Sequence, residues 1–92
     1  MPALEHEVLD VMRHVFAAEL EYPGAVELHH DLLRDLRVDS LNAIILAVAL
    51  EDHFHVRLAQ DDTVGVVTVG DLVARVAQRV RDERAAPPPV TP

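Results

Sequence analysis

Apolar residues recur at helical spacing in three stretches of the chain, and turn-forming residues separate these stretches. Between residues 4 and 20 they return every three or four positions, with acidic residues mostly on the other side, which predicts an amphipathic helix. Tyr22-Pro23-Gly24 is a strong turn signal that ends this helix. A second helix is predicted from Ser40 to Phe54 or His55. The last helix has a continuous apolar stripe: Leu72, Val73, Val76, Ala77 and Val80.

The segments between these helices are less regular. Residues 25–38 form a long connection in which Asp31 is placed to lead a short turn. We expect a short helix over residues 64–67. A strand over residues 64–69 is the competing interpretation, because they are rich in β-branched side chains, but a lone strand would have no partner. Thr68 and Asp71, three residues apart, form a capping box for the last helix.

These elements predict an all-α fold, a small four-helix bundle with three main helices and a short third helix. One domain spans residues 1–84. The tail, residues 85–92, is rich in proline and is predicted to be disordered.

The second helix has two apolar faces when its residues are placed 100° apart. One face is the expected core face: Ala43, Leu46, Ala47, Leu50 and Phe54. The other, bordered by Glu51 and Asp52, consists of Leu41, Ile44, Ile45 and Val48. This second face is either an exposed docking surface for partner proteins, with Asp52 at its end, or is covered by the long loop.

Length, composition and charge exclude some classes of function and partner. A chain of 92 residues with no cysteine has room for one small core, which favours a binding or carrier role over catalysis. The net charge of −8 argues against nucleic acid and anionic membranes as partners and favours basic proteins. The polar N-terminus does not resemble a signal peptide and no segment is long and apolar enough to span a bilayer, so we expect a cytoplasmic protein. The histidines lack the spacing of metal ligands.

Asp39-Ser40-Leu41 stands where the polar connection meets the apolar second helix. Either the Asp39 or the Ser40 side chain could cap the helix by accepting hydrogen bonds from its first N–H groups. The same position also suits a phosphate ester on Ser40, because the positive end of the helix dipole and its unpaired donors attract anions.

Four segments resemble the acyl carrier proteins, in register and without insertions, over roughly residues 4 to 82. They are the stretch of residues 32–41 ending in Asp39-Ser40-Leu41, residues 49–54 (Ala-Leu-Glu-Asp-His-Phe), residues 56–58 followed by acids, and residues 68–73 (Thr-Val-Gly-Asp-Leu-Val). In that family the serine of the Asp-Ser-Leu triplet is the modified residue.

The resemblance implies that Ser40 accepts phosphopantetheine from coenzyme A in a reaction catalysed by a separate transferase with Mg²⁺. It further implies that Asp39 positions the metal and the hydroxyl, and that Leu41 adjoins the arm. The thiol of the arm would hold acyl groups as thioesters, and the bundle would shelter them between its second and third helices. The protein would be a monomeric carrier and not an enzyme, serving a phosphopantetheinyl transferase, an acyl-loading enzyme, and a ketosynthase or acyltransferase.

Three positions depart from the family pattern: Arg37 replaces a common glycine, Asn42 a common acid, and Ile45 a glutamate midway along the second helix. The lost acids belong to the surface that basic partners recognise in the family. This favours a carrier for a specialised fatty-acid or polyketide pathway of secondary metabolism. An aminoacyl or peptidyl carrier, and an unmodified helical interaction adaptor, are the alternatives.

Overall fold

The computed structural model describes residues 2–58 and 60–85. In chain order the elements are α1 (Ala3–Ala18), α2 (Ser40–Phe54), a short 3₁₀ helix η1 (Gln60–Thr63) and α3 (Val69–Ala85). The described residues contain no strand, only one isolated antiparallel bridge between Asp31 and Thr68. The all-α prediction is therefore confirmed, with the difference that the fourth helix is a single 3₁₀ turn.

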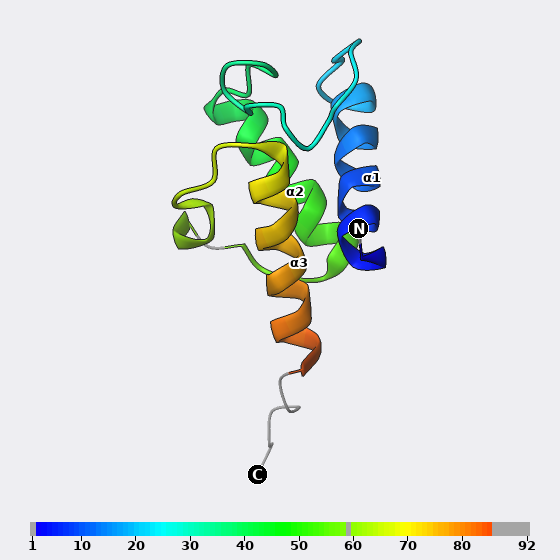
Figure 1. Ribbon diagram of the computed structural model, residues 1–92, viewed down its shortest axis with the longest axis vertical. Coiled ribbons are helices and arrows are strands. Elements are labelled where there is room, and N and C mark those ends of the chain that lie inside the picture. Colours follow the sequence, from blue (N-terminus) through cyan, green and yellow to red (C-terminus); the bar gives the residue numbers. More distant parts are fainter. Residues whose placement is uncertain (1, 59, 86–92) are drawn as a thin grey trace.

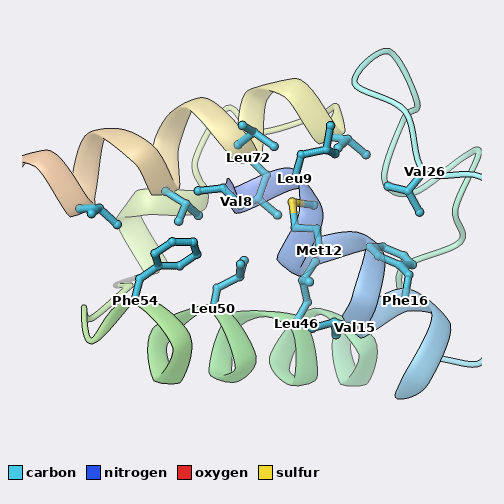
Figure 2. Close-up of a cluster of buried hydrophobic side chains, with 14 of the residues drawn as sticks. Val8, Leu9, Met12, Val15, Phe16, Val26, Leu46, Leu50, Phe54 and Leu72 are labelled. Carbon is cyan, nitrogen blue, oxygen red and sulfur yellow. The ribbon is translucent and has the colours of Figure 1, made fainter. Parts of the chain in front are cut away.

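The three α-helices share one apolar core. α1 packs against both α2 and α3 and runs in the opposite direction to α2 (Figure 1). Figure 2 shows side chains from all three helices pointing into the common interior. Phe16 and Met12 are among the largest fully buried side chains, and burying each stabilises the fold by about 1.5–3 kcal/mol. The stripe predicted for the last helix is confirmed, because all five of its members are buried: Leu72, Val73, Val76, Ala77 and Val80.

The helix ends lie close to their predicted positions. α1 ends at Ala18, two residues before the predicted end, and Glu21 takes a left-handed conformation with φ 52° at the turn. Tyr22 then folds back, placing its ring edge-on to Phe16 with 5.9 Å between the ring centres. α2 ends at Phe54, where His55 adopts φ 56° and terminates the helix.

The prediction of a short helix over residues 64–67 was wrong. The helical turn comes earlier, at Gln60–Thr63, and Gly65 reverses the chain with φ 81°. The following residues are held by the long α1–α2 loop through three hydrogen bonds of 2.9 Å: Leu32 N to Val67 O, Val69 N to His30 O, and Gly70 N to Leu28 O. We call this arrangement the loop clasp.

The loop clasp accounts for the β-branched composition of the residues before α3. These residues pair with the backbone of the α1–α2 loop, although the pairing extends over only one bridge. Gly70 permits this approach, because a Cβ atom there would stand 3.2 Å from the carbonyl oxygen of Leu28. Two loops that are distant in sequence are thereby joined at one end of the bundle.

The predicted capping box is confirmed at the start of α3. Asp71 N donates to Thr68 Oγ1 at 3.1 Å, and Asp71 Oδ2 accepts hydrogen bonds from the N–H groups of Thr68 and Val67, both at 3.0 Å. These backbone donors favour the charged carboxylate, with the Thr68 N–H the largest cause, and hold the pKa of Asp71 below its ordinary value of 3.8.

Part of the sequence prediction lies beyond the described residues. Ala85 is the last residue of α3, so the predicted domain end at residue 84 differs from the helix end by one position. Residues 86–92, most of the predicted proline-rich tail, lie outside the described residues, and their disorder stays a prediction. Within residues 2–58 and 60–85, no helix combines the length and apolar character needed to cross a bilayer.

Candidate functional site

Ser40 is the first residue of α2, and its side chain is exposed. Asp39 is extended (φ −91°, ψ −175°), and its Oδ1 accepts a hydrogen bond of 2.8 Å from Asn42 N. Asp39 is therefore the N-cap, and the Ser40 hydroxyl forms no hydrogen bond with any described residue. The sequence left open whether Asp39 or Ser40 caps the helix, and the structure shows that Asp39 does. The serine oxygen therefore remains available to form a phosphate ester.

The loop before Ser40 is held by its own polar groups. Asp31 Oδ1 accepts hydrogen bonds from Leu33 N at 2.9 Å and Arg34 N at 2.8 Å, which confirms the turn expected at Asp31. The carboxylate of Asp35 accepts from Asp31 N at 2.7 Å. Leu36 anchors the loop because its side chain is buried in the core. These contacts present Ser40 from an ordered loop rather than from a free segment.

The surroundings of Ser40 fit a phosphodiester on its oxygen. The helix N-terminus carries a partial positive charge and first-turn N–H groups without intrahelical partners. The first turn of α2 contains no acid, and the carboxylate of Asp39 is engaged with Asn42 N. Among the described residues, no group of three or more histidine, aspartate or glutamate side chains is placed to hold a metal ion.

The outer face of α2 exposes an apolar ridge, which consists of Leu41 (65% exposed), Ile44 (61%) and Val48 (47%). Asp52 is also exposed, one turn beyond the end of the ridge. Ile45 was assigned to the second apolar face, as a docking residue if that face is exposed, and this assignment was wrong because its side chain is half-buried and packs against the core. The ridge is thus narrower than the predicted second face.

A cavity of about 600 Å³ lies beside α2. Its walls come from α2, the α1–α2 loop, the segment between α2 and α3, and the first turn of α3. The apolar members are Leu32, Leu33, Val38, Ala43, Leu46, Ala47, Leu50, Leu58, Val66, Val67 and Leu72, and the polar members are Asp31, Arg34 and Thr63. Ala43 and Ala47, which the sequence placed on the core face, line this space instead of filling the core. The resemblance implied a shelter beside the second helix, but the sequence pattern did not identify its lining; the two alanines between large apolar residues were a signal that space remains there.

Known proteins resemble this chain in sequence and in structure. The family model described as the phosphopantetheine attachment site matches residues 10–76. Acyl carrier protein 3 of Ralstonia nicotianae is 39% identical over 70 residues, covering 75% of this chain and 80% of the relative. The meromycolate extension acyl carrier protein of Mycobacterium tuberculosis is 30% identical over 87 residues, covering 90% of this chain and 72% of the relative.

A solved structure agrees with the sequence relatives. It is described as a candidate acyl carrier protein from Mycobacterium tuberculosis, is 28% identical in sequence and superposes with a TM-score of 0.66. The match covers 83% of this chain and 97% of the solved one.

Proposed function

The chain belongs to the phosphopantetheine-attachment family of acyl carrier proteins, and from this premise we propose that Ser40 is the residue that carries the phosphopantetheine arm. The protein acts as a carrier and not as a catalyst. When attached, the arm supplies a thiol that holds acyl groups as thioesters.

One observation carries this proposal: the Ser40 hydroxyl is exposed and unengaged at the first residue of α2, because Asp39 has taken the cap. Ser40 is also the only serine in the chain. The helix N-terminus holds a phosphate on Ser40 through its backbone donors and dipole. Asp39 keeps this end of the helix in place, and its carboxylate positions the Ser40 hydroxyl when the transferase binds. Leu41, the next residue, forms the apolar contact beside the arm.

The cavity beside α2 supports an aliphatic cargo. Most of its lining is leucine, valine and alanine, with Asp31, Arg34 and Thr63 as the polar members, so an acyl chain entering it would exchange water for a mainly apolar surface. The cargo belongs to a specialised fatty-acid or polyketide pathway, and the meromycolate extension relative favours the fatty-acid type.

The partners are a phosphopantetheinyl transferase, an acyl-loading enzyme, and a ketosynthase or acyltransferase. The carrier works in the cytoplasm as a monomer.

Incubation with coenzyme A, Mg²⁺ and a broad-specificity phosphopantetheinyl transferase, followed by intact-mass measurement, tests the attachment. The wild-type chain should gain the mass of one phosphopantetheine, and Ser40→Ala should gain none. Thr63→Ala, which removes a different hydroxyl, is the control and should be modified like the wild type. Circular dichroism should show Ser40→Ala folded, because the cap hydrogen bond comes from Asp39. A wild-type chain that stays unmodified, or a modified Ser40→Ala, would contradict the proposal.

A further inference from the structure

A turn in the α1–α2 loop, residues 27–30, supplies two acceptors of the loop clasp. The carbonyl oxygens of Leu28 and His30 accept hydrogen bonds of 2.9 Å from Gly70 N and Val69 N. Val69 and Gly70 are the first two residues of α3, so their N–H groups have no partner within the helix. The turn therefore caps α3 from outside, and half of the clasp depends on the shape of the turn.

Two hydrogen bonds between Glu27 and His30 close this turn. His30 N donates to Glu27 O at 3.1 Å, and Glu27 N donates to His30 Nδ1 at 3.0 Å. Because Nδ1 accepts a hydrogen bond, the neutral ring carries its proton on Nε2. A protonated ring has an N–H at both nitrogens and cannot accept from Glu27 N. The second bond of the turn therefore exists only with a neutral ring.

The position of His30 adds an electrostatic reason. Its carbonyl oxygen binds the N–H of Val69, so the residue lies against the N-terminus of α3, where the helix dipole is positive. Its side chain is half-buried, and the ring of His29 lies 4.6 Å away between ring centres. A positive charge on the His30 ring is therefore unfavourable while the clasp is closed.

Charged groups from three elements lie around the turn and the clasp. Within the loop, Asp31 and Asp35 bind backbone N–H groups, and Glu27 pairs with Arg13 of α1 at 3.4 Å. On α3, the carboxylate of Asp71 accepts two backbone hydrogen bonds. The three loop acids are neighbours of the ring in sequence, so they attract its charge whether the clasp is closed or open. They favour proton uptake without holding the clasp, and Asp71 offsets the α3 dipole only in part.

We propose that His30 makes the loop clasp sensitive to pH, so that the clasp is closed over the neutral ring and loosens when the ring takes up a proton. Histidine is the side chain that ordinarily titrates between pH 5 and 8. The contribution of the turn bond is present above this range and is lost as pH falls through it. Leu32 and Val67, which the clasp joins, also line the cavity beside α2, so acid loosens this wall of the cavity. The inference concerns the unmodified chain and does not depend on cargo at Ser40.

Amide hydrogen exchange on the full unmodified chain, followed by NMR, tests the proposal. The measured quantity is the protection factor, which corrects each exchange rate for its intrinsic dependence on pH. Between about pH 7.5 and about pH 5.5, the protection of Val69 and Gly70 should fall about fivefold, as expected for loss of one hydrogen bond. This fall should follow the titration of the His30 ring in the same spectra.

Three variants separate the acceptor from the charge. His30→Asn places an amide oxygen where Nδ1 stood and does not titrate, so the protection of Val69 and Gly70 should stay within about twofold between the two pH values. His30→Leu has no acceptor and should show the low protection at both. His14→Asn is the matched control, because His14 is exposed on α1 and its side chain forms no hydrogen bond or ion pair with a described residue. It should lose protection like the wild type.

The ring nitrogens give a test that needs no variant. Their ¹⁵N shifts at about pH 7.5 should identify the proton on Nε2 of His30. A proton on Nδ1, or equal wild-type protection at both pH values, would overturn the inference. So would a His30→Asn variant that loses protection as the wild type does. None of these results bears on the attachment at Ser40, which the intact-mass measurement decides separately.

Discussion

At the scale of single residues, Asp39 has the most consequences. One of its carboxylate oxygens caps α2 by accepting a hydrogen bond from Asn42 N, and the adjacent Ser40 hydroxyl makes no hydrogen bond with the described residues. The residue therefore has a structural role, which needs only an acceptor oxygen, and a proposed role in modification, which needs a charge. A pair of substitutions separates the two.

Asp39→Ala should lower the free energy of unfolding by about 1 kcal/mol through loss of the cap. Asp39→Asn keeps an acceptor oxygen of equal capping strength, so its stability should lie close to the wild type. Both variants should be modified more slowly than the wild type, because both lack the carboxylate that positions the Ser40 hydroxyl. Urea unfolding and modification rates measure the two effects. An Asn variant modified at the wild-type rate would show that the charge has no part in the reaction.

Neighbouring isoleucines on α2 provide a second residue-scale prediction. Ile45 is half-buried against the core, so Ile45→Glu should destabilise the domain by about 1–3 kcal/mol, the cost of placing an unpaired carboxylate there. Ile44 is 61% exposed, and Ile44→Glu should change stability by no more than about 0.5 kcal/mol. Thermal melts of the two variants make the comparison. Equal stabilities would show that Ile45 is not part of the packed face.

At the scale of elements, the periodicity of apolar residues predicted where the helices lie better than it predicted which helix faces are buried. The spacing of apolar residues and the end signals placed α2 correctly from Ser40 to Phe54, because both are encoded locally. Ile45 and Ala43 were misassigned because the exposure of a helix face depends on where neighbouring elements approach. The 3₁₀ turn before α3 was misplaced for a similar reason: residues 67–70 are held by the distant α1–α2 loop.

The candidate site, too, could be predicted only in part from the sequence. The Asp39-Ser40-Leu41 triplet was identified from a resemblance in sequence, and the choice of Asp39 as cap needed the backbone geometry. A shelter beside α2 was implied by the resemblance alone. Its lining could not be derived from the sequence, since it is formed by side chains from α2, the α1–α2 loop, the α2–α3 segment and α3, and no local pattern encodes it.

The capping box of α3 leads to a pH prediction. Because the folded chain holds the pKa of Asp71 below 3.8, its carboxylate stabilises the fold at pH values above the unfolded pKa, and this stabilisation is lost as pH falls through the lower folded pKa. Asp71→Asn should therefore melt at a lower temperature than the wild type at neutral pH, and the difference should shrink below about pH 4. Asp52→Asn, an equal change in charge without a cap, should show no such difference. Identical pH profiles for the two variants would contradict the assignment.

At the scale of the whole molecule, the loop clasp and the cavity belong together. The clasp joins the α1–α2 loop to the segment before α3, and residues of both, Leu32 and Val67 among them, also line the cavity. The wall opposite α2 is thus held by backbone hydrogen bonds and not by side-chain packing alone. This arrangement keeps the space open while the three helices pack tightly around their own core.

Filling the cavity tests its proposed role as the shelter for cargo. A medium-length saturated acyl chain loaded through Ser40 should raise the melting temperature of the wild type, because the chain binds the folded state and not the unfolded one. Ala47→Phe places a ring in the cavity and should abolish this rise, while the modification rate of Ser40 stays within about twofold. Ala17→Phe, an equal change at an exposed position of α1, should keep the full rise. If Ala47→Phe gains as much from the acyl chain as the wild type does, the cargo lies elsewhere on the protein.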